Sequence, residues 1–289
     1  MLIKKQKKIA PLTKFRIGGY SKYFAKPDNI DDLNYLIDNY FLDDIFILGA
    51  GSNLLVRDGG IDGITIRLGA TFNFIEQDDM QLIKVGCATL DCDLAKFACK
   101  NGIGGFEFLI GIPGTIGGGI AMNAGAYNRS FEDIILEVKA LDLVSKKIVT
   151  LSSEEIGFCY RGNSLSNYLF LEGLFIGYKD SIDNIKYNMN SIVATRNISQ
   201  PILSYTCGST FQNPINCQSW KLLKEVGCDK LSVGDANFSP LHCNFIINNG
   251  NAKSKDIEEL IHIAENRVFD KFGILLKKEI RIIGDDICY

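Results

Sequence analysis

The chain has 289 residues, of which 46% are hydrophobic and 22% are charged, and its formal net charge at pH 7 is −3. These values are typical of a soluble globular protein with one large domain or two smaller ones. The slightly acidic balance gives no reason to expect nucleic acid as a partner.

The nine cysteines are scattered along the chain, and no two of them form a C-x-x-C pair. This distribution gives poor support to a zinc or iron–sulfur site, so we expect no metal. The N-terminal residues lack the pattern of a signal peptide, which favours reduced thiols and a cytoplasmic location.

The first third of the chain is predicted to alternate between helices and strands. Apolar periodicity predicts helices over 30–40 and 91–100, and the Asn101-Gly102 pair closes the second one. Short apolar runs predict strands, which fall at 45–48, 65–68, 72–77 and 81–86.

The remainder of the chain continues the mixed pattern. Strands over 133–143 and 147–151 suggest a hairpin, and Ser152 with Glu155 forms a capping-box signature for a short helix. Helices follow at 181–199, 218–226 and 254–272, and strands at 168–178, 242–248 and 274–284. The composition changes near 180–200, from glycine-rich βα material to an α+β unit, so we expect two domains with a cleft between them.

A glycine-rich turn, Gly49-Ala50-Gly51-Ser52-Asn53, follows the predicted strand at 45–48. Backbone N–H groups and hydroxyls in such a turn suit a phosphate group. The third glycine of a dinucleotide fingerprint is replaced by Leu54, and no Gly-Lys-Ser/Thr follows, so neither a Rossmann nor a P-loop site is supported. A plain tight turn remains the alternative.

A second glycine-rich segment, Gly111–Tyr127, contains six glycines and no charge. Each glycine costs roughly 0.5–1 kcal/mol more than alanine on folding, so the concentration calls for a reason. Residues 108–128 reach the length of a membrane helix, but Pro113, Thr115 and the glycines make the segment too irregular, and we expect no membrane insertion. Both glycine segments together could wrap a polyanionic cofactor, while a strained structural crossover is the alternative.

Several motifs occur in an order that resembles one known family. They are Ile17-Gly-Gly, GAGSNLLV (49–56), GFEFLIGIPGTIGGGIAMNAGAY (105–127), FCYRGNS (158–164), CGSTFQNP (207–214), LHCNFIINNGNA (241–252) and LKKEIRIIG (276–284). The chain resembles the UDP-N-acetylenolpyruvoylglucosamine reductase family over nearly its whole length. The resemblance implies an FAD-binding region of the vanillyl-alcohol-oxidase (PCMH) type with two α+β subdomains over 1–190, and a C-terminal α+β substrate-binding domain over 191–289.

The resemblance also implies the residues that hold FAD. They are Gly49, Ala50, Gly51, Ser52, Asn53, Pro113, Gly114, Thr115, Gly117, Gly118, Ala121, Asn123 and Gly125. Relatives that attach flavin covalently commonly use a histidine, and the two histidines of this chain, His242 and His262, both lie outside these segments. We therefore expect FAD to be bound non-covalently.

The activity implied by the resemblance has two half-reactions. NADPH, as co-substrate, reduces FAD, and the hydride then passes to the enolpyruvyl group of UDP-N-acetylglucosamine-enolpyruvate to give UDP-N-acetylmuramate for peptidoglycan. The matched catalytic residues are Arg161 to stabilise an enolate, Ser209 to donate a proton, and Glu279 beside the enolate. Weaker substrate candidates are Tyr160, Asn213, His242 and Asn244, although the last two could equally be core polar groups.

The sequence departs from the family pattern at two places. Gly162 and Asn163 separate Arg161 from Ser164, where a single residue is commoner, so the equivalence of Ser164 is open. The short segment 177–196 indicates the shorter family type without a tyrosine-bearing loop. We expect a monomer that acts on small molecules. The alternatives are another FAD-dependent oxidoreductase of the same superfamily and a non-catalytic nucleotide-sugar binder.

Overall fold

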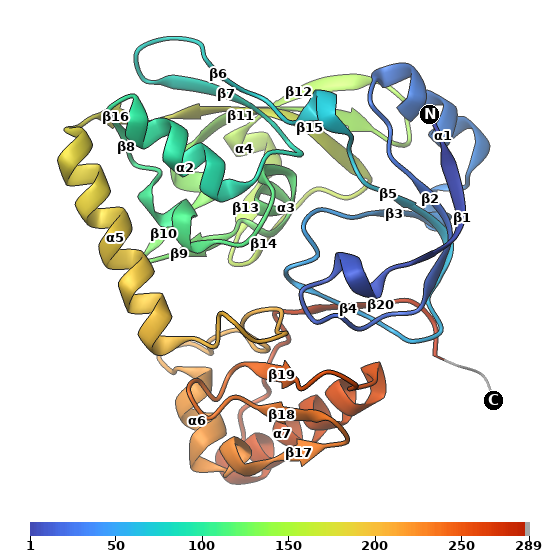
Figure 1. The fold of residues 1–289 in the computed structure, drawn as a ribbon, viewed down its shortest axis with the longest axis vertical. Coiled ribbons are helices and arrows are strands. Elements are labelled where there is room, and N and C mark those ends of the chain that lie inside the picture. The colour runs from blue at the N-terminus through green and yellow to red at the C-terminus, as the bar shows by residue number, and fades with distance from the viewer. Residues whose placement is uncertain (287–289) are drawn as a thin grey trace. The chain divides into compact units, whose positions relative to one another are not determined.

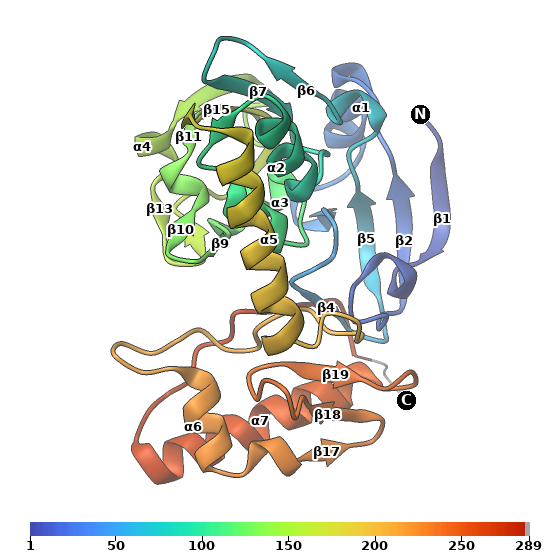
Figure 2. The same ribbon diagram turned by 60° about the vertical axis from the view of Figure 1, so that its left-hand side comes forward.

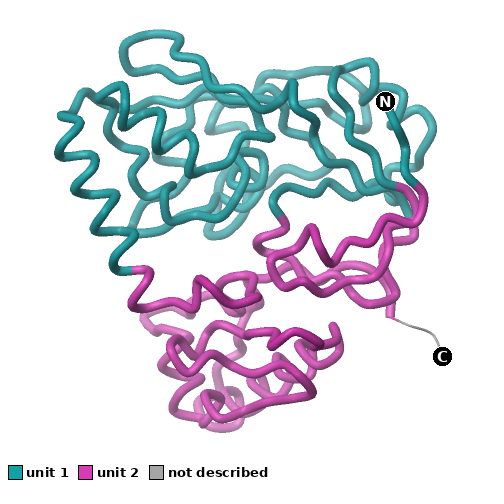
Figure 3. Tube along the Cα trace, viewed as in Figure 1, with its two compact units in different colours: residues 1–4, 24–50, 63–195 teal, residues 5–23, 51–62, 196–289 magenta. Residues whose placement is uncertain are grey.

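The computed structural model describes residues 1–286, which form two compact α+β units (Figure 3). The first unit consists of residues 1–4, 24–50 and 63–195, and the second of 5–23, 51–62 and the chain from 196 onward. Both units are therefore discontinuous in sequence. The functional boundary expected between residues 190 and 191 stays a prediction, because compactness alone does not test which ligand each part binds.

An antiparallel five-stranded sheet forms the centre of the first unit (Figure 1). Its strand order is β12-β11-β15-β7-β6, with bounds Ile148–Ser152, Ile135–Asp142, Tyr168–Ile176, Leu82–Gly86 and Ile75–Gln77. The hairpin expected from 133–151 is confirmed, since Val138 pairs with Leu151. The buried faces of these strands contribute to a core that includes Phe106, Phe131 and Phe175.

The first unit also contains helices α1 (Ile30–Asn39), α2 (Asp91–Lys100), α3 (Ile116–Met122), α4 (Ser153–Ile156) and most of α5 (Ile182–Ser199). Helix α3 packs against β7 and β15. The predicted capping box of α4 is present, because the Ser152 hydroxyl accepts from the Glu155 N–H and the Glu155 carboxylate accepts from the Ser152 N–H. Helix α5 is exposed or half-exposed along most of its length, and Ile185 is its one buried residue.

A second sheet has the strand order β1-β2-β5-β3, with bounds Ile3–Lys8, Tyr20–Ala25, Ile61–Ile66 and Ile45–Ile47. Strand β3 is parallel to β5 and runs directly into the turn at Gly49. Two-stranded pairs complete the connections: β8 (Ile103–Gly104) with β16 (Tyr178–Lys179), β9 (Gly125–Ala126) with β10 (Arg129–Ser130), and β13 (Phe158–Cys159) with β14 (Gly162–Asn163).

The second unit contains a three-stranded antiparallel sheet, β17-β18-β19, with bounds Ser232–Val233, Ala236–Phe238 and Ile246–Asn248. Helix α7 (Ser254–Phe272) packs against β17 and β18, and α6 (Ser219–Glu225) packs against α7 (Figure 2). The core of this unit combines Phe211, Phe238 and Leu260 with Phe15 and Leu55 from the early segments. Strand β4 (Leu54–Val56) pairs in parallel with β20 (Arg281–Ile283).

Four predicted strands are wrong in extent. Strand β5 covers Ile61–Ile66 where 65–68 was expected, and β6 covers only Ile75–Gln77 where 72–77 was expected. The structure has β20 only over Arg281–Ile283 where a strand was expected over 274–284, and β19 only over Ile246–Asn248 where 242–248 was expected. The segment before β20 changes partner along its length: Lys278 forms an isolated bridge with Phe211, and the chain then pairs with β4 from Arg281. A regular ladder needs one continuous partner, which periodicity within one segment does not reveal.

Candidate active site

The turn at Gly49–Asn53 presents backbone donors. Within residues 1–286, the N–H groups of Gly49, Ala50, Gly51 and Ser52 donate to no acceptor. Gly51 lies in the left-handed region with φ +64°, and a Cβ atom on it would lie 2.3 Å from the Leu12 carbonyl oxygen. Glycine is therefore required there, and a row of unused N–H groups is suited to anionic oxygens.

The second glycine segment meets this turn within the first unit. A Cβ atom on Gly49 would lie 2.7 Å from the Thr115 Oγ1 atom and 3.9 Å from the Gly118 Cα atom. Thr115 caps α3, and its hydroxyl accepts a long hydrogen bond of 3.4 Å from the Gly118 N–H. A Cβ atom on Gly118 itself would meet only Thr115 Oγ1, at 3.4 Å, so the space beside this glycine is open. The open backbone and the unused donors fit a phosphate-bearing cofactor, as expected from the two segments.

A buried carboxyl group lies behind the second segment. Asp91, the first residue of α2, is 0% exposed, and neither carboxyl oxygen has a hydrogen-bond partner within residues 1–286. A Cβ atom on Gly114 would lie 2.3 Å from the Asp91 Oδ2 atom, so the carboxyl rests against the Gly114 backbone. Burial raises the pKa of Asp91 well above its usual range, which favours the neutral acid. Sequence analysis missed this residue, because an acidic side chain at the start of a helix is ordinary.

Arg161 lies in the turn between β13 and β14. Its backbone is in the left-handed region with φ +60°, and its guanidinium carbon lies 5.1 Å from the centre of the Tyr160 ring. A Cβ atom on Gly125 would be 3.2 Å from an Arg161 guanidinium nitrogen. The end of the glycine segment and the candidate catalytic arginine are therefore neighbours in the first unit.

Amide side chains hold this turn against α3. The Asn123 Nδ2 atom donates to the Cys159 carbonyl at 3.1 Å, and its Oδ1 atom accepts from the Glu132 N–H at 3.1 Å. The Asn163 amide donates to the carbonyl of Ile120, in the last turn of α3, at 3.1 Å. Asn123 therefore supports the position of Arg161 from within the glycine segment.

Ser164 makes hydrogen bonds to backbone carbonyl groups in this structure. Its hydroxyl donates to the Ile156 carbonyl at 3.0 Å, at the end of α4. Its backbone N–H donates to the carbonyls of Ile156 and Gly157. These bonds describe a structural role for Ser164, in keeping with the extra residue that separates it from Arg161.

Ser209 and Glu279 lie on adjacent segments of the second unit. Ser209 forms an isolated bridge with Phe245, and the Glu279 N–H donates to the carbonyl of Thr210, the residue after Ser209, at 2.8 Å. Both residues are half-buried, and the space around the preceding Gly208, with φ +87°, is open within 4 Å of its Cβ position. The fold thus brings together two candidate catalytic residues that are far apart in the sequence.

The substrate candidates of the second unit differ in their surroundings. Asn244 is buried, and its amide accepts from the Phe211 N–H at 3.0 Å and donates to the Phe211 carbonyl at 2.8 Å. Asn213 is exposed, and its Oδ1 atom accepts from the Ser219 N–H at 3.0 Å. The amide of Asn244 therefore holds the strand that follows Ser209, which is the polar core role left open by the sequence.

His242 is half-buried, with its ring centre 4.8 Å from that of Phe245 and 6.2 Å from that of Trp220. Its Nδ1 atom accepts from the Asn244 N–H at 3.3 Å, which requires an unprotonated Nδ1. Burial lowers the pKa of His242, so the neutral ring is favoured.

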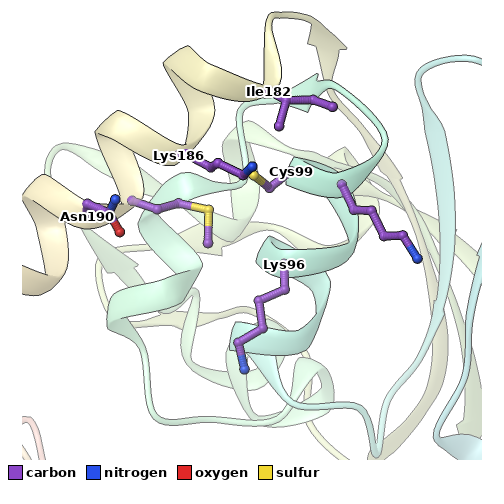
Figure 4. A pocket seen from close by; sticks show the side chains of 7 residues that line it. Lys96, Cys99, Ile182, Lys186 and Asn190 are labelled. Atoms are coloured by element: carbon purple, nitrogen blue, oxygen red, sulfur yellow. The ribbon is translucent and has the colours of Figure 1, made fainter.

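Other features of the described residues do not add to this site. A pocket of about 360 Å³ between α2 and α5 is lined by Lys96, Cys99, Lys100, Ile182, Lys186, Met189 and Asn190, none of which is a candidate site residue (Figure 4). Within residues 1–286, no three His, Cys, Asp or Glu side chains are arranged to hold a metal ion. None of the helices in the same range combines the length and hydropathy of a membrane span.

Comparison with known proteins identifies the family. Residues 22–152 match an FAD binding domain, and residues 200–283 match the UDP-N-acetylenolpyruvoylglucosamine reductase C-terminal domain. The UDP-N-acetylenolpyruvoylglucosamine reductase of Rickettsia typhi (strain ATCC VR-144 / Wilmington) is 47% identical over 97% of this chain and 95% of its own. The chain belongs to the UDP-N-acetylenolpyruvoylglucosamine reductase family.

Further relatives agree with this assignment to the reductase family. The enzyme of the same name from Orientia tsutsugamushi (strain Boryong) is 46% identical over 97% of this chain and 94% of its own. The crystal structure of the reductase from Thermus caldophilus superimposes with a TM-score of 0.84 at 28% identity, covering 97% of this chain and 98% of the other. The predicted fold class and FAD as cofactor are confirmed. The roles of individual site residues stay predictions.

Proposed function

We propose that this member of the reductase family converts UDP-N-acetylglucosamine-enolpyruvate to UDP-N-acetylmuramate, with NADPH as the reductant. The observation that carries the proposal is that Ser209 and Glu279 lie on adjacent segments of the second unit, where the Glu279 N–H donates to the carbonyl of Thr210, the residue after Ser209, at 2.8 Å. FAD, when bound, accepts a hydride from NADPH and supplies it to the terminal carbon of the enolpyruvyl group.

The protein's own residues would stabilise the negative charge of the intermediate and supply the proton that completes the reaction. Hydride addition places negative charge on the enolpyruvyl carboxylate and its neighbouring carbon, and Arg161 is the fixed cation proposed to stabilise it. The Ser209 hydroxyl then gives its proton to the carbon next to the carboxylate, which is basic enough to accept it from such a weak acid. Glu279 is proposed to act beside the same intermediate, protonated or hydrogen-bonded, because an ionised carboxylate would repel the enolate.

The cofactor would be held by this chain's backbone. The unused N–H groups of Gly49 to Ser52 suit the pyrophosphate, and the open backbone at Gly118 allows a close approach. No histidine is present in either glycine segment, which supports dissociable FAD. We further propose that the enzyme is a monomer in the cytoplasm.

The test is the visible absorbance spectrum of the purified protein, recorded before and after anaerobic addition of NADPH. We expect a flavin band that NADPH bleaches and that UDP-N-acetylglucosamine-enolpyruvate then restores. Bleaching by NADPH without recovery on adding this substrate would point to a different FAD oxidoreductase. A colourless protein that takes up no added FAD would favour a nucleotide-sugar binder.

A further inference from the structure

Asn53 ends the glycine turn, yet its side chain is directed to another part of the second unit. The Asn53 Nδ2 atom donates to the Glu279 carbonyl oxygen at 3.0 Å, across 226 residues of sequence. The Asn53 carbonyl in turn accepts from the Arg281 N–H at 3.1 Å, at the start of the parallel pair of β4 and β20. Asn53 therefore makes two hydrogen bonds to the segment that carries Glu279, one through its side chain and one through its backbone carbonyl.

The backbone of Glu279 is held from both sides. Its carbonyl accepts from Asn53, and its N–H donates to the Thr210 carbonyl at 2.8 Å. Thr210 is the neighbour of Ser209, and its own N–H donates to the Asn244 carbonyl at 2.7 Å. A continuous set of hydrogen bonds thus runs from the end of the glycine turn through Glu279 to the segment of Ser209.

We propose that Asn53 is a positioning residue for Glu279, which couples the end of the cofactor turn to the residues of proton transfer. The inference rests on the proposed function, since it assigns a purpose to the position of Glu279. An asparagine suits this position, because its amide donates to the Glu279 carbonyl without adding charge beside a developing enolate. The backbone N–H groups of Gly49 to Ser52 remain the proposed contacts for the pyrophosphate.

The consequence can be measured with Asn53→Ala, and with Asn53→Ser as a second variant should the first fail to fold. Loss of one hydrogen bond to a backbone carbonyl corresponds to about a 3- to 10-fold effect. We expect hydrogen exchange at the Glu279 and Ile280 amides to become faster by about that factor. Reoxidation of the flavin by the enolpyruvyl substrate should slow by the same factor, and by more than reduction of the flavin by NADPH does.

Two comparisons separate positioning from a general structural effect. In Asn237→Ala, the control, an amide donation to a backbone carbonyl of the second unit is also lost, that to Phe238 at 2.7 Å, together with the bond that the Asn237 Oδ1 atom accepts from the Asn249 amide at 2.8 Å. This control should leave the exchange at Glu279 and both half-reactions unchanged. In a Glu279→Gln background, Asn53→Ala should add little to the slow reoxidation, because both substitutions act on one residue.

Several results would overturn the inference. Unchanged exchange at Glu279 and Ile280 in Asn53→Ala would show that the amide does not hold this segment. Weaker FAD binding with equal loss in both half-reactions would assign Asn53 to the cofactor. If the wild-type protein fails to turn over the enolpyruvyl substrate, the proposed function fails, and the exchange measurement still decides whether Asn53 holds Glu279.

Discussion

At the scale of single residues, Ser209 offers the sharpest test of the chemistry. We predict that Ser209→Ala leaves flavin reduction by NADPH near normal and slows reoxidation by the enolpyruvyl substrate by at least about 100-fold, in the range expected for a positioned proton donor. Rapid mixing with absorbance detection separates the two rates. Ser232→Ala, a change at the exposed residue of β17, is the control. Equal losses in both half-reactions of Ser209→Ala would instead indicate damaged folding or flavin binding.

Arg161 combines a strained backbone with a proposed catalytic charge. Its φ of +60° is unfavourable for a residue with a Cβ atom, and strain of this kind is concentrated at functional sites. We predict that Arg161→Gly keeps the melting temperature within a few degrees, since glycine relieves the strain, and slows reoxidation by about 100-fold or more. Asn167→Gly is the matched control, because Asn167 has φ +64° and no proposed role. An Arg161→Gly enzyme with normal reoxidation would remove this residue from the mechanism.

At the scale of elements, α3 contains neighbouring glycines with opposite surroundings. A Cβ atom on Gly118 would meet only Thr115 Oγ1 at 3.4 Å, whereas one on Gly119 would lie 2.1 Å from the buried Phe131 ring. We predict that Gly118→Ala folds at least as stably as the wild type, because alanine is the better helix former, and yet binds FAD about 10-fold or more weakly. Thermal denaturation and fluorescence titration with FAD measure the two effects.

Gly119→Ala is the internal comparison for the same helix. It should destabilise the protein by roughly 1–3 kcal/mol, because the added methyl group overpacks the core against Phe131. If Gly118→Ala binds FAD as the wild type does, the open face of α3 is not where the cofactor approaches.

The elements also show what the sequence can and cannot predict. Helices α2 and α7 were predicted with their observed bounds, because apolar periodicity, and for α2 the Asn101-Gly102 stop signal, are local properties. The bond from Asn53 to Glu279 joins residues 226 apart and involves a backbone carbonyl, so no local pattern reports it. The burial of Asp91 could not be predicted from the sequence either, because it depends on the packing of Gly114 against its carboxyl group. The family motifs identified the candidate residues, and only the fold shows which of them are neighbours.

At the scale of the whole molecule, the buried Asp91 links stability to pH. Burial raises its pKa in the folded state, so the folded protein retains a proton that the unfolded chain releases above about pH 4. The stabilisation of the folded protein by this bound proton is fully present below the pKa of Asp91 in the unfolded chain. It is lost as the pH rises towards the pKa of Asp91 in the folded protein. In Asp91→Asn the side chain does not titrate, so the stability of this variant relative to wild type should rise by about 1.4 kcal/mol per pH unit in that window.

Chemical denaturation of both proteins at several pH values from 4 to 8 measures this difference. Asp93→Asn, a change of a partly exposed carboxylate two residues further along α2, controls for the loss of a carboxylate at the start of the helix. A constant difference between Asp91→Asn and wild type across this range would show that Asp91 is ionised in the folded protein.

The parallel pairing of β4 with β20 has a consequence for biosynthesis. Strand β4 directly follows the cofactor turn and is an early segment of the chain, whereas its partner spans Arg281–Ile283. During translation the turn is therefore released long before the strand that fixes its far end has been synthesised. Contacts between such distant segments form slowly. We accordingly expect flavin capture to follow translation, and truncated nascent chains that lack β20 should retain little FAD.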